Sequence, residues 1–408
     1  MKRINKIAIL LNGPREIDMY SKIIELIPRK KIEILISDIA SSEVGRNTIN
    51  KSLKKILRKK RIKFKNFSSI YRKYFYKVIL SSGELTSTKI TINSILKYLY
   101  SQSIGKLIRI LKLHIILENF FGRPFTGAHR DNLGSFWYPE KDLAEVSVKL
   151  PKDLDLKLKV YPPKAFDKAF DIFFTISNFE KSIIKKRLEN KKCQVIGYPR
   201  YNNLVNSKII KQRVKKEFRI KDHKKIVFWM PTFIHFPKEQ DQNILLWIEK
   251  ISLLTTFYNI IIRPHPRTLA SNPDLKSRLK ELNFFVDTNL SRDLGNIINA
   301  SDLVMCDYGG TIFGSLYLRK PILLLNTSEK FKFVNNLINS DSLDIKLREQ
   351  LINFNQNISE EGIKSKMKYA TSQNYQNKIN IVRNKYFDKE SNIINKNTKN
   401  FLLDLLKN

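Results

Sequence analysis

The chain has 408 residues, of which 42% are hydrophobic, a length that predicts two ordinary domains and a composition that argues against wholesale disorder. Only two cysteines occur, Cys193 and Cys306, which argues against a disulfide framework and against a cysteine-based metal site. The surplus of 75 Lys and Arg over 38 Asp and Glu gives a formal net charge of +37, which favours anionic partners.

The N-terminus, MKRINKIAILLNGPREID, becomes polar after a handful of apolar residues. This pattern is typical of a first strand and not of a signal peptide or a membrane span. No apolar run in the chain reaches the length of about 18 residues that a membrane span needs. We therefore expect a cytoplasmic protein.

Positive charge is densest in a segment of about residues 44–117, in which Glu84 is the only acidic residue. Its core, KSLKKILRKKRIKFKNFSSIYRKYFYK at 51–77, has apolar residues interleaved with the basic ones. Such a segment suits a nucleic-acid backbone, an anionic membrane surface or a polyanionic substrate, and it is equally typical of a solvated helical face. Charge alone leaves these alternatives open.

Apolar runs separated by helix-like segments predict two α/β halves. In the first half, the expected strands cover residues 6–13, 31–38, 76–83, 171–177 and 193–200. Ser177 is a plausible cap for a helix that joins the last two of them. In the second half, the expected strands cover residues 225–232, 258–266, 283–288, 302–307 and 321–326.

The polar and basic stretch from 201 to 225 is a reasonable domain junction. We therefore expect an N-terminal, acceptor-side Rossmann-like domain at 1–205 with the basic segment as an insertion. A C-terminal, donor-binding Rossmann-like domain would cover 206–375, and a helical tail would cover 376–408. Alternating strands and helices imply parallel sheets, which bind ligands beyond the carboxyl ends of their strands.

The loop in IIIRPHPR, residues 260–267, follows an apolar strand. Two prolines stiffen its backbone and place His265 at the exit of the strand, between Arg263 and Arg267. Two guanidinium groups and an imidazole suit a diphosphate. The alternative is a proline-rich loop in which the histidine has a structural role.

The stretch ASDLVMCDYGGTIFGSLYLRKPILLLN, residues 300–326, predicts a strand that ends at Asp307 and a helix that opens at Thr311. Between them, Gly309 and Gly310 would let the backbone approach an anion at the helix N-terminus. A plain strand-to-helix turn would look the same. Thr232, at the end of VFWMPT, is placed either to contact the ligand or only to end its strand.

In the first half, FFGRPFTGAHRDNLGSFWYPEK at 120–141 is the segment richest in reactive side chains. His129 suits proton abstraction from a hydroxyl, and Asp131 or Glu140 could orient it. Arg200 stands at a strand exit beside the junction and would touch a ligand or fix the hinge. The first turn, NGPRE, lacks the GxGxxG pattern, so a Rossmann dinucleotide site is not supported.

Four stretches in order, VIGYPRYNNL, IVFWMPT, IIIRPHPR and the stretch from 294 to 326, resemble the CDP-glycerol glycerophosphotransferase family over about residues 190–330. The resemblance implies a GT-B scaffold, with two Rossmann-like domains facing across a cleft, and bacterial enzymes that build teichoic acids or capsular polymers. It assigns His265 and the turn from Asp307 to Thr311 to the donor phosphates. It assigns the general base to a first-half histidine, for which His129 is the candidate by position.

This sequence departs from the family in two places. Gly309 and Gly310 replace two serines, which shifts any hydroxyl contact to Thr311, and the His-Gly-Thr-Pro string is absent. The Gly-Gly turn is also similar to that of UDP-GlcNAc 2-epimerases and of several sugar transferases of the same fold. The alternatives to a polyol-phosphate donor are therefore a nucleotide-sugar glycosyltransferase and an epimerase.

Together these features predict a transferase that moves a glycerol-phosphate, polyol-phosphate or sugar unit from a nucleotide-activated donor to a hydroxyl of a bacterial surface polymer. We expect no metal, because carboxylates do not cluster, and no cofactor besides the donor. We expect a peripheral position at the inner face of the cell membrane, held by the basic segment. Nucleic acid is not an expected partner, since no nucleic-acid module is recognised.

Overall fold

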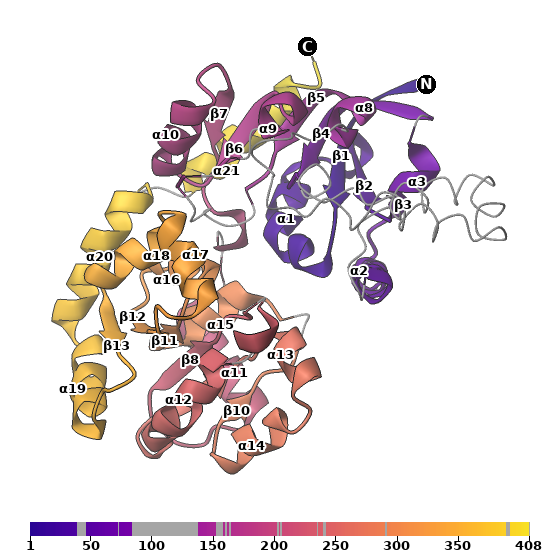
Figure 1. Ribbon diagram of the computed structural model, residues 1–408. Coiled ribbons are helices and arrows are strands. Elements are labelled where there is room, and N and C mark those ends of the chain that lie inside the picture. Colours follow the sequence, from indigo (N-terminus) through magenta and orange to yellow (C-terminus); the bar gives the residue numbers. More distant parts are fainter. Residues whose placement is uncertain are drawn as a thin grey trace, which may run out of the picture. The chain divides into compact units, whose positions relative to one another are not determined.

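The computed structural model describes residues 1–38, 46–71, 73–83, 138–151, 158–159, 161–162, 165–201, 204, 206–234, 236–239, 242–289, 292–388 and 392–407. The chain forms two compact units (Figure 1). Unit 1 comprises 1–152, 162–200 and 390–408, and unit 2 comprises 153–161 and 201–389. None of the helices in the described ranges has the length and apolar character of a membrane span.

Unit 1 is built on a seven-stranded sheet with the order β3-β2-β1-β4-β5-β6-β7, and every strand pair is parallel. The strands are β1 (Lys2–Leu11), β2 (Ile32–Ile36), β3 (Phe64–Asn66), β4 (Tyr74–Ser81), β5 (Ala144–Lys149), β6 (Ile172–Thr175) and β7 (Lys192–Val195). The strand order reverses between β1 and β4, and ligands of open parallel sheets bind beyond the carboxyl ends of the strands at such a point.

The helices of unit 1 bury their apolar stripes against this sheet. They are α1 (Pro14–Leu26), α2 (Arg46–Lys59), α3 (Phe67–Ile70), α8 (Pro139–Leu143), α9 (Ala165–Ala169), α10 (Asn178–Arg187) and α21 (Asn392–Asp404). Short 3-10 turns lie at η1 (Arg29–Lys31) and η3 (Pro199–Tyr201). The helix expected after Ser177 is confirmed, since the Ser177 hydroxyl accepts a hydrogen bond from the Glu180 amide and caps α10.

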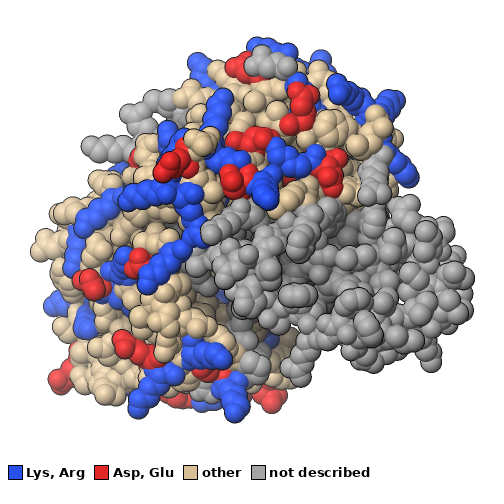
Figure 2. Space-filling model, turned by 45° about the horizontal axis from the view of Figure 1, so that its top comes forward, with Lys and Arg blue, Asp and Glu red and all other residues tan. Residues whose placement is uncertain are grey.

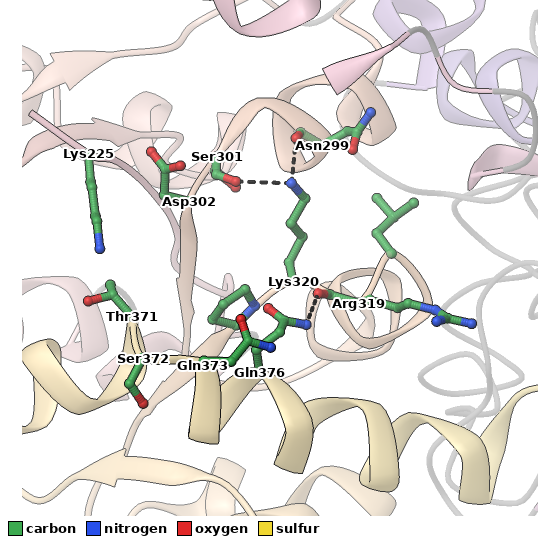
Figure 3. A pocket seen from close by; sticks show the side chains of 12 residues that line it. Lys225, Asn299, Ser301, Asp302, Arg319, Lys320, Thr371, Ser372, Gln373 and Gln376 are labelled. Atoms are coloured by element: carbon green, nitrogen blue, oxygen red, sulfur yellow. Dashed lines mark hydrogen bonds between the residues drawn. The ribbon is translucent and has the colours of Figure 1, made fainter. Parts of the chain in front are cut away.

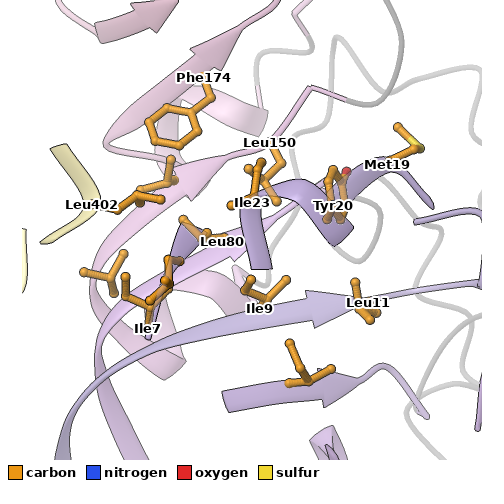
Figure 4. Packing of buried hydrophobic residues seen from close by; sticks show 14 of the residues in the cluster. Ile7, Ile9, Leu11, Met19, Tyr20, Ile23, Leu80, Leu150, Phe174 and Leu402 are labelled. Atoms are coloured by element: carbon orange, nitrogen blue, oxygen red, sulfur yellow. The ribbon is translucent and has the colours of Figure 1, made fainter. Parts of the chain in front are cut away.

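The core of unit 1 joins residues from both ends of the chain. Ile7, Ile9 and Leu80 of the central strands are fully buried together with Leu402 of α21 (Figure 4). Burying a leucine side chain contributes about 1.5–3 kcal/mol. The last helix is therefore an integral part of the first unit.

Unit 2 repeats the architecture with a six-stranded, all-parallel sheet of order β10-β9-β8-β11-β12-β13. Its strands are β8 (Ile226–Met230), β9 (Asn259–Ile262), β10 (Phe285–Val286), β11 (Leu303–Cys306), β12 (Ile322–Leu325) and β13 (Ile352–Phe354). The order reverses between β8 and β11. The loops after these two strands are therefore the expected ligand site of this unit.

Ten helices are described in unit 2, and several have side-chain caps, such as Asp293 and Ser372. They are α11 (Ser207–Phe218), α12 (Gln242–Ser252), α13 (Pro266–Ser271), α14 (Leu275–Glu281), α15 (Leu294–Ala300), α16 (Gly310–Tyr317), α17 (Lys332–Asn339), α18 (Leu343–Lys346), α19 (Glu360–Ala370) and α20 (Gln373–Tyr386). The 3-10 turns are η4 (Pro237–Glu239), η5 (Leu253–Thr256) and η6 (Leu347–Glu349).

The prediction of two α/β halves with parallel sheets is confirmed. All ten expected strands have a counterpart, and β3, β5 and β13 were not anticipated. The start of the basic segment, from residue 46 to residue 66, forms α2 and β3 and is built into the edge of the first sheet. The assignment of one unit to the acceptor and the other to the donor stays a prediction.

Candidate functional site

The carboxyl edge of the unit 2 sheet brings three of the anticipated loops into contact. Thr232, two residues beyond β8, donates its amide hydrogen to the Asp307 carboxylate beyond β11, at 2.9 Å. Its neighbour Phe233 stacks on the His265 ring beyond β9, with centroids 5.1 Å apart. These contacts follow from the parallel sheet, because β8 lies between β9 and β11. The candidate site is therefore one continuous surface around the end of β8.

In the turn after β11, the protein itself uses every backbone polar group between the Asp307 carbonyl and the Gly309 carbonyl. Arg348 donates to the Asp307 carbonyl, and the Thr232 hydroxyl donates to the Tyr308 carbonyl. The Tyr308 and Gly309 amides donate to carboxylates, and the Gly309 carbonyl accepts from the Ile312 amide at 3.3 Å. Buried backbone groups need such partners, so the turn is held throughout its length.

The next two amides, of Gly310 and Thr311, have no acceptor in the described part of the chain. They open helix α16, where unpaired amides and the helix dipole attract anions. Both residues are only partly buried. An anion could therefore reach the two amides without displacing a protein acceptor.

The Asp307 side chain is buried in the turn and is hydrogen-bonded within the protein. Its side chain is 1% exposed, and it accepts hydrogen bonds from the Thr232 and Tyr308 amides and from the Asn243 side chain. Burial raises the pKa of Asp307 above the ordinary carboxyl value, although these hydrogen bonds act in the opposite direction. Its carboxylate links the loop after β8 to the loop after β11.

The hydroxyl of Thr232 is similarly occupied by the Tyr308 carbonyl. The Thr311 hydroxyl lies 3.4 Å from the Met230 sulfur, a weak acceptor. Of the two threonines anticipated from the sequence, Thr311 thus has the hydroxyl that a ligand could more readily use.

Two residues of the site were missed by sequence reasoning. Asp344 is fully buried, and one of its carboxylate oxygens accepts from the Gly309 amide at 3.1 Å. The Arg348 guanidinium lies over the Tyr308 ring, 4.0 Å from its centroid, and donates to Asn326 at 2.7 Å. They lie in a polar stretch without strand-end or glycine signals, 35 and more residues beyond the turn, so nothing local in the sequence marks them.

His265 has a fixed ring and a fixed tautomer. It is the N-cap of α13, and its Nδ1 accepts from the Arg267 amide at 3.2 Å. Because Nδ1 is an acceptor, the neutral ring carries its proton on Nε2. The ring is partly exposed and stacks on Phe233, over which the Arg267 guanidinium also lies at 5.6 Å. His265 can therefore present an N–H donor at the sheet edge.

The Arg263 side chain points toward the end of β10. Its guanidinium pairs at 2.7 Å with Asp287, whose side chain is 1% exposed, and Arg292 also pairs with that carboxylate at 2.9 Å. Two guanidinium groups on one buried carboxylate fix the ends of β9 and β10 to each other. Arg263 is thus committed to a structural ion pair, while Arg267 is exposed.

The candidate residues of unit 1 are only partly within the described residues. His129 and Asp131 lie outside them. Arg200 is 7% exposed and belongs to η3. Glu140 is fully buried and accepts from the Ser81 hydroxyl at 2.8 Å, at the carboxyl end of β4.

A further cavity lies at the opposite edge of the unit 2 sheet. It encloses about 330 Å³ and is lined mostly by polar side chains, including Lys225, Asp302 and Lys320 (Figure 3). Lys320 donates to the carbonyls of Asn299 and Ser301, at the end of α15. The cavity lies before the strands begin, so it is separate from the loops described above. Within the described ranges, no group of three or more His, Cys, Asp or Glu side chains is placed to hold a metal ion.

Comparison with known proteins places this surface in a family context. Residues 165–330 match the model of the CDP-Glycerol:Poly(glycerophosphate) glycerophosphotransferase family. The matched segment contains both the His265 loop and the glycine turn. The resemblance inferred from the sequence is thereby confirmed for this segment. A search of the curated proteins gave no match.

Solved structures with the same fold cover both units. A variant of the wall teichoic acid polymerase TagF is 12% identical, with a TM-score of 0.59 over 99% of this chain and 89% of that one. The UDP-GlcNAc 2-epimerase from Neisseria meningitidis, bound to UDP-GlcNAc, is 15% identical, with a TM-score of 0.54 over 100% of both chains. At such identities the similarity establishes the fold, which is GT-B-like, as predicted.

Proposed function

We propose that this chain is a GT-B transferase that moves a glycerol-phosphate, polyol-phosphate or sugar unit from a nucleotide-activated donor to a hydroxyl of a bacterial surface polymer. The observation that carries the proposal is the family match over residues 165–330. It coincides with a sheet edge at which the N-terminus of helix α16 and the side chain of His265 both lie. These groups suit the phosphates of a nucleotide donor.

The donor would bind at the end of β8 and β11. The Gly310 and Thr311 amides would hold the phosphate oxygens, the Thr311 hydroxyl would add a contact, and His265 would donate through Nε2. Arg267 is exposed beside His265 and supplies positive charge. Thr232, Gly309 and Asp307 would shape the turn, and Arg263 would act through its ion pair with Asp287.

With CDP-glycerol as donor, the acceptor hydroxyl oxygen would form a bond to the phosphorus that carries glycerol. The bond from that phosphorus to the CMP oxygen breaks, and CMP leaves with the electron pair. The amides, His265 and Arg267 would stabilise the negative charge that develops on the departing group. The hydroxyl proton would pass to a base in unit 1, for which we propose His129 with Asp131, while Arg200 would contact the substrate.

A release assay with defined donors tests this proposal. The chain is incubated with CDP-glycerol, CDP-ribitol or UDP-sugars, with and without a polyol-phosphate polymer, and free nucleotide is measured. We expect release of CMP or UDP only when the polymer is present. A UDP-sugar that is converted to its epimer without any acceptor would overturn the transferase in favour of the epimerase. No turnover and no binding of any donor would overturn both.

We further propose that the enzyme works at the inner face of the cell membrane, against anionic lipid, and has no nucleic-acid partner. Figure 2 shows Lys and Arg side chains spread over the described surface of one face, with Asp and Glu among them. Helix α2 adds a run of exposed basic residues, of which Lys55, Arg58 and Lys59 are three. Each basic residue near an anionic membrane contributes about 1 kcal/mol of attraction.

Neutral substitution of five basic residues tests the membrane contact. These residues are Lys54, Lys55, Arg58, Lys59 and Lys60. The variant should be released from vesicles that contain anionic lipid, and its retention would contradict the proposal. A gel-shift assay at modest salt should detect no binding of nucleic acid.

A further inference from the structure

The glycine turn after β11 is held by a segment that lies outside the strand ends of the site. This segment, residues 342–348, is called here the clamp segment and comprises α18 and the start of η6. Asp344 accepts from the Gly309 amide at 3.1 Å. Arg348 donates to the Asp307 carbonyl and covers the Tyr308 ring. Three consecutive turn residues are therefore held by two side chains one helical turn apart.

The clamp segment is itself rigidly placed. The Ser342 hydroxyl donates to the second oxygen of Asp344, so both carboxylate oxygens have a partner. Leu343 and Leu347 are buried and anchor the segment in unit 2. Because Asp344 is fully buried, its carboxylate cannot exchange the Gly309 amide for water at low cost.

The turn needs this support because of its backbone conformation. Gly309 has φ +90° and ψ −164°, a region essentially restricted to glycine. Without a fixed acceptor for its amide, Gly309 could adopt many other backbone conformations. The Asp344 carboxylate selects the one in which the Gly309 amide points inward and the following two amides begin α16.

We propose that Asp344, supported by Arg348, is a positioning residue for the donor phosphate. By occupying the Gly309 amide and the Asp307 carbonyl, the clamp segment leaves the Gly310 and Thr311 amides as the open donors. The assignment rests on the proposed function in so far as the anion is a donor phosphate. The fixed conformation of the turn does not depend on it.

The conformational part is tested by hydrogen exchange at residue resolution, without ligand. In Asp344→Ala, exchange at the Gly309 amide should rise about tenfold or more, as expected for the loss of one buried hydrogen bond. Asp344→Asn keeps an acceptor oxygen and should stay close to wild type. Lys346→Ala is the matched control, since Lys346 is an exposed residue of the same helix. Unchanged exchange at Gly309 in Asp344→Ala would overturn the proposal.

The functional part is tested by titration with CDP-glycerol and with cytidine. Affinity for CDP-glycerol should fall about tenfold in Asp344→Ala, whereas affinity for cytidine, which has no phosphate, should not change. Equal losses for both ligands would indicate a general loss of structure and would overturn the positioning role. Should Asp344→Ala not fold, Ser342→Ala removes only the hydroxyl that orients the carboxylate and should give the same pattern more weakly.

The two proposals fail differently. If wild type binds no nucleotide donor but Asp344→Ala still accelerates exchange at Gly309, the clamp segment fixes the turn but has no role in binding a donor. If wild type binds and transfers from a donor, and Asp344→Ala binds it equally well, the proposed function stands and the positioning role of Asp344 is refuted.

Discussion

The two ring nitrogens of His265 have different roles, and two substitutions can distinguish these roles. Its Nδ1 accepts a hydrogen bond from the Arg267 amide and caps α13. Its Nε2 is the proposed hydrogen-bond donor to the phosphate of the nucleotide donor. Asparagine places an oxygen near the position of Nδ1 and has nothing near Nε2. Glutamine places its amide nitrogen near the position of Nε2 and leaves the cap unmade. His265→Asn and His265→Gln therefore remove opposite halves of the imidazole.

The expected magnitudes follow from these contacts. Loss of the cap costs about 1 kcal/mol of unfolding free energy. Loss of the stack on Phe233 costs about 0.5–1.5 kcal/mol in both variants, since neither side chain has a ring. A hydrogen bond to a charged phosphate contributes about 1.5–3 kcal/mol, which is about tenfold to 150-fold in affinity. His265→Asn should therefore be the more stable variant and the weaker binder.

Thermal unfolding and calorimetric titration with CDP-glycerol measure the two effects on the same samples. His223→Asn, in the linker before β8, is the control for a histidine that lies away from the sheet edge. If His265→Asn bound the donor as tightly as wild type, the imidazole would not be a phosphate ligand. If His265→Gln bound as weakly as His265→Asn, the ring would act through its stack and not through Nε2.

Three further substitutions test the turn and the helix behind it. Burial raises the pKa of Asp307 in the folded state, so the stability of wild type relative to Asp307→Asn should decrease as pH rises above the ordinary carboxyl pKa. Urea unfolding at a series of pH values from about 4 upward would detect the change, and an increase would contradict the burial argument. Gly309→Ala should lower the free energy of unfolding by about 1–3 kcal/mol through backbone strain at φ +90°. Steric overlap does not contribute, because the new Cβ would lie 3.8 Å from the nearest atom, the Thr232 hydroxyl oxygen. A smaller loss in urea unfolding would mean that the turn adopts another conformation. In Gly314→Ala the new Cβ would overlap the Tyr201 side chain, and the free energy of unfolding should fall by about 1–3 kcal/mol. The additional substitution Tyr201→Leu should restore most of that loss.

The sheet edge could be predicted from the sequence because its signals are local. Apolar runs end at Met230, Ile262 and Cys306, and each is followed within a few residues by a proline, a histidine or a glycine pair. Parallel pairing then brings these ends together without further information. The same reasoning missed β3, β5 and β13, because none of them contains the run of consecutive apolar residues by which β8, β11 and β12 are recognised.

The direction of each side chain could not be predicted in this way. Arg263 and Arg267 look equivalent in the sequence, but Arg263 reaches a buried carboxylate at Asp287, which lies on another strand end. Asp307 stands at a strand end in the sequence, and the structure shows that its carboxylate accepts from amides of two loops. Asp344 carries no local signal at all. Such roles depend on contacts between residues that are distant in the chain, which periodicity does not encode.

The basic segment illustrates how burial sharpens a prediction from charge. Its apolar residues Leu53 and Leu57 on α2 are fully buried in the core of unit 1, together with Leu402 of α21. They are therefore not available to insert into a bilayer, and membrane contact through α2 would be electrostatic. This distinguishes α2 from an interfacial amphipathic helix, which buries its apolar face in the lipid.

Electrostatic contact has a measurable signature in its dependence on salt. The screening length is about 8 Å at physiological ionic strength and about 3 Å at 1 M. Binding to vesicles of anionic lipid should therefore be strong at low salt and be reversed by salt, and vesicles of neutral lipid should not compete. If binding persisted at about 1 M salt, apolar insertion would be required. The buried positions of Leu53 and Leu57 rule them out for that insertion while unit 1 stays folded, so a different segment of the chain would have to make the contact.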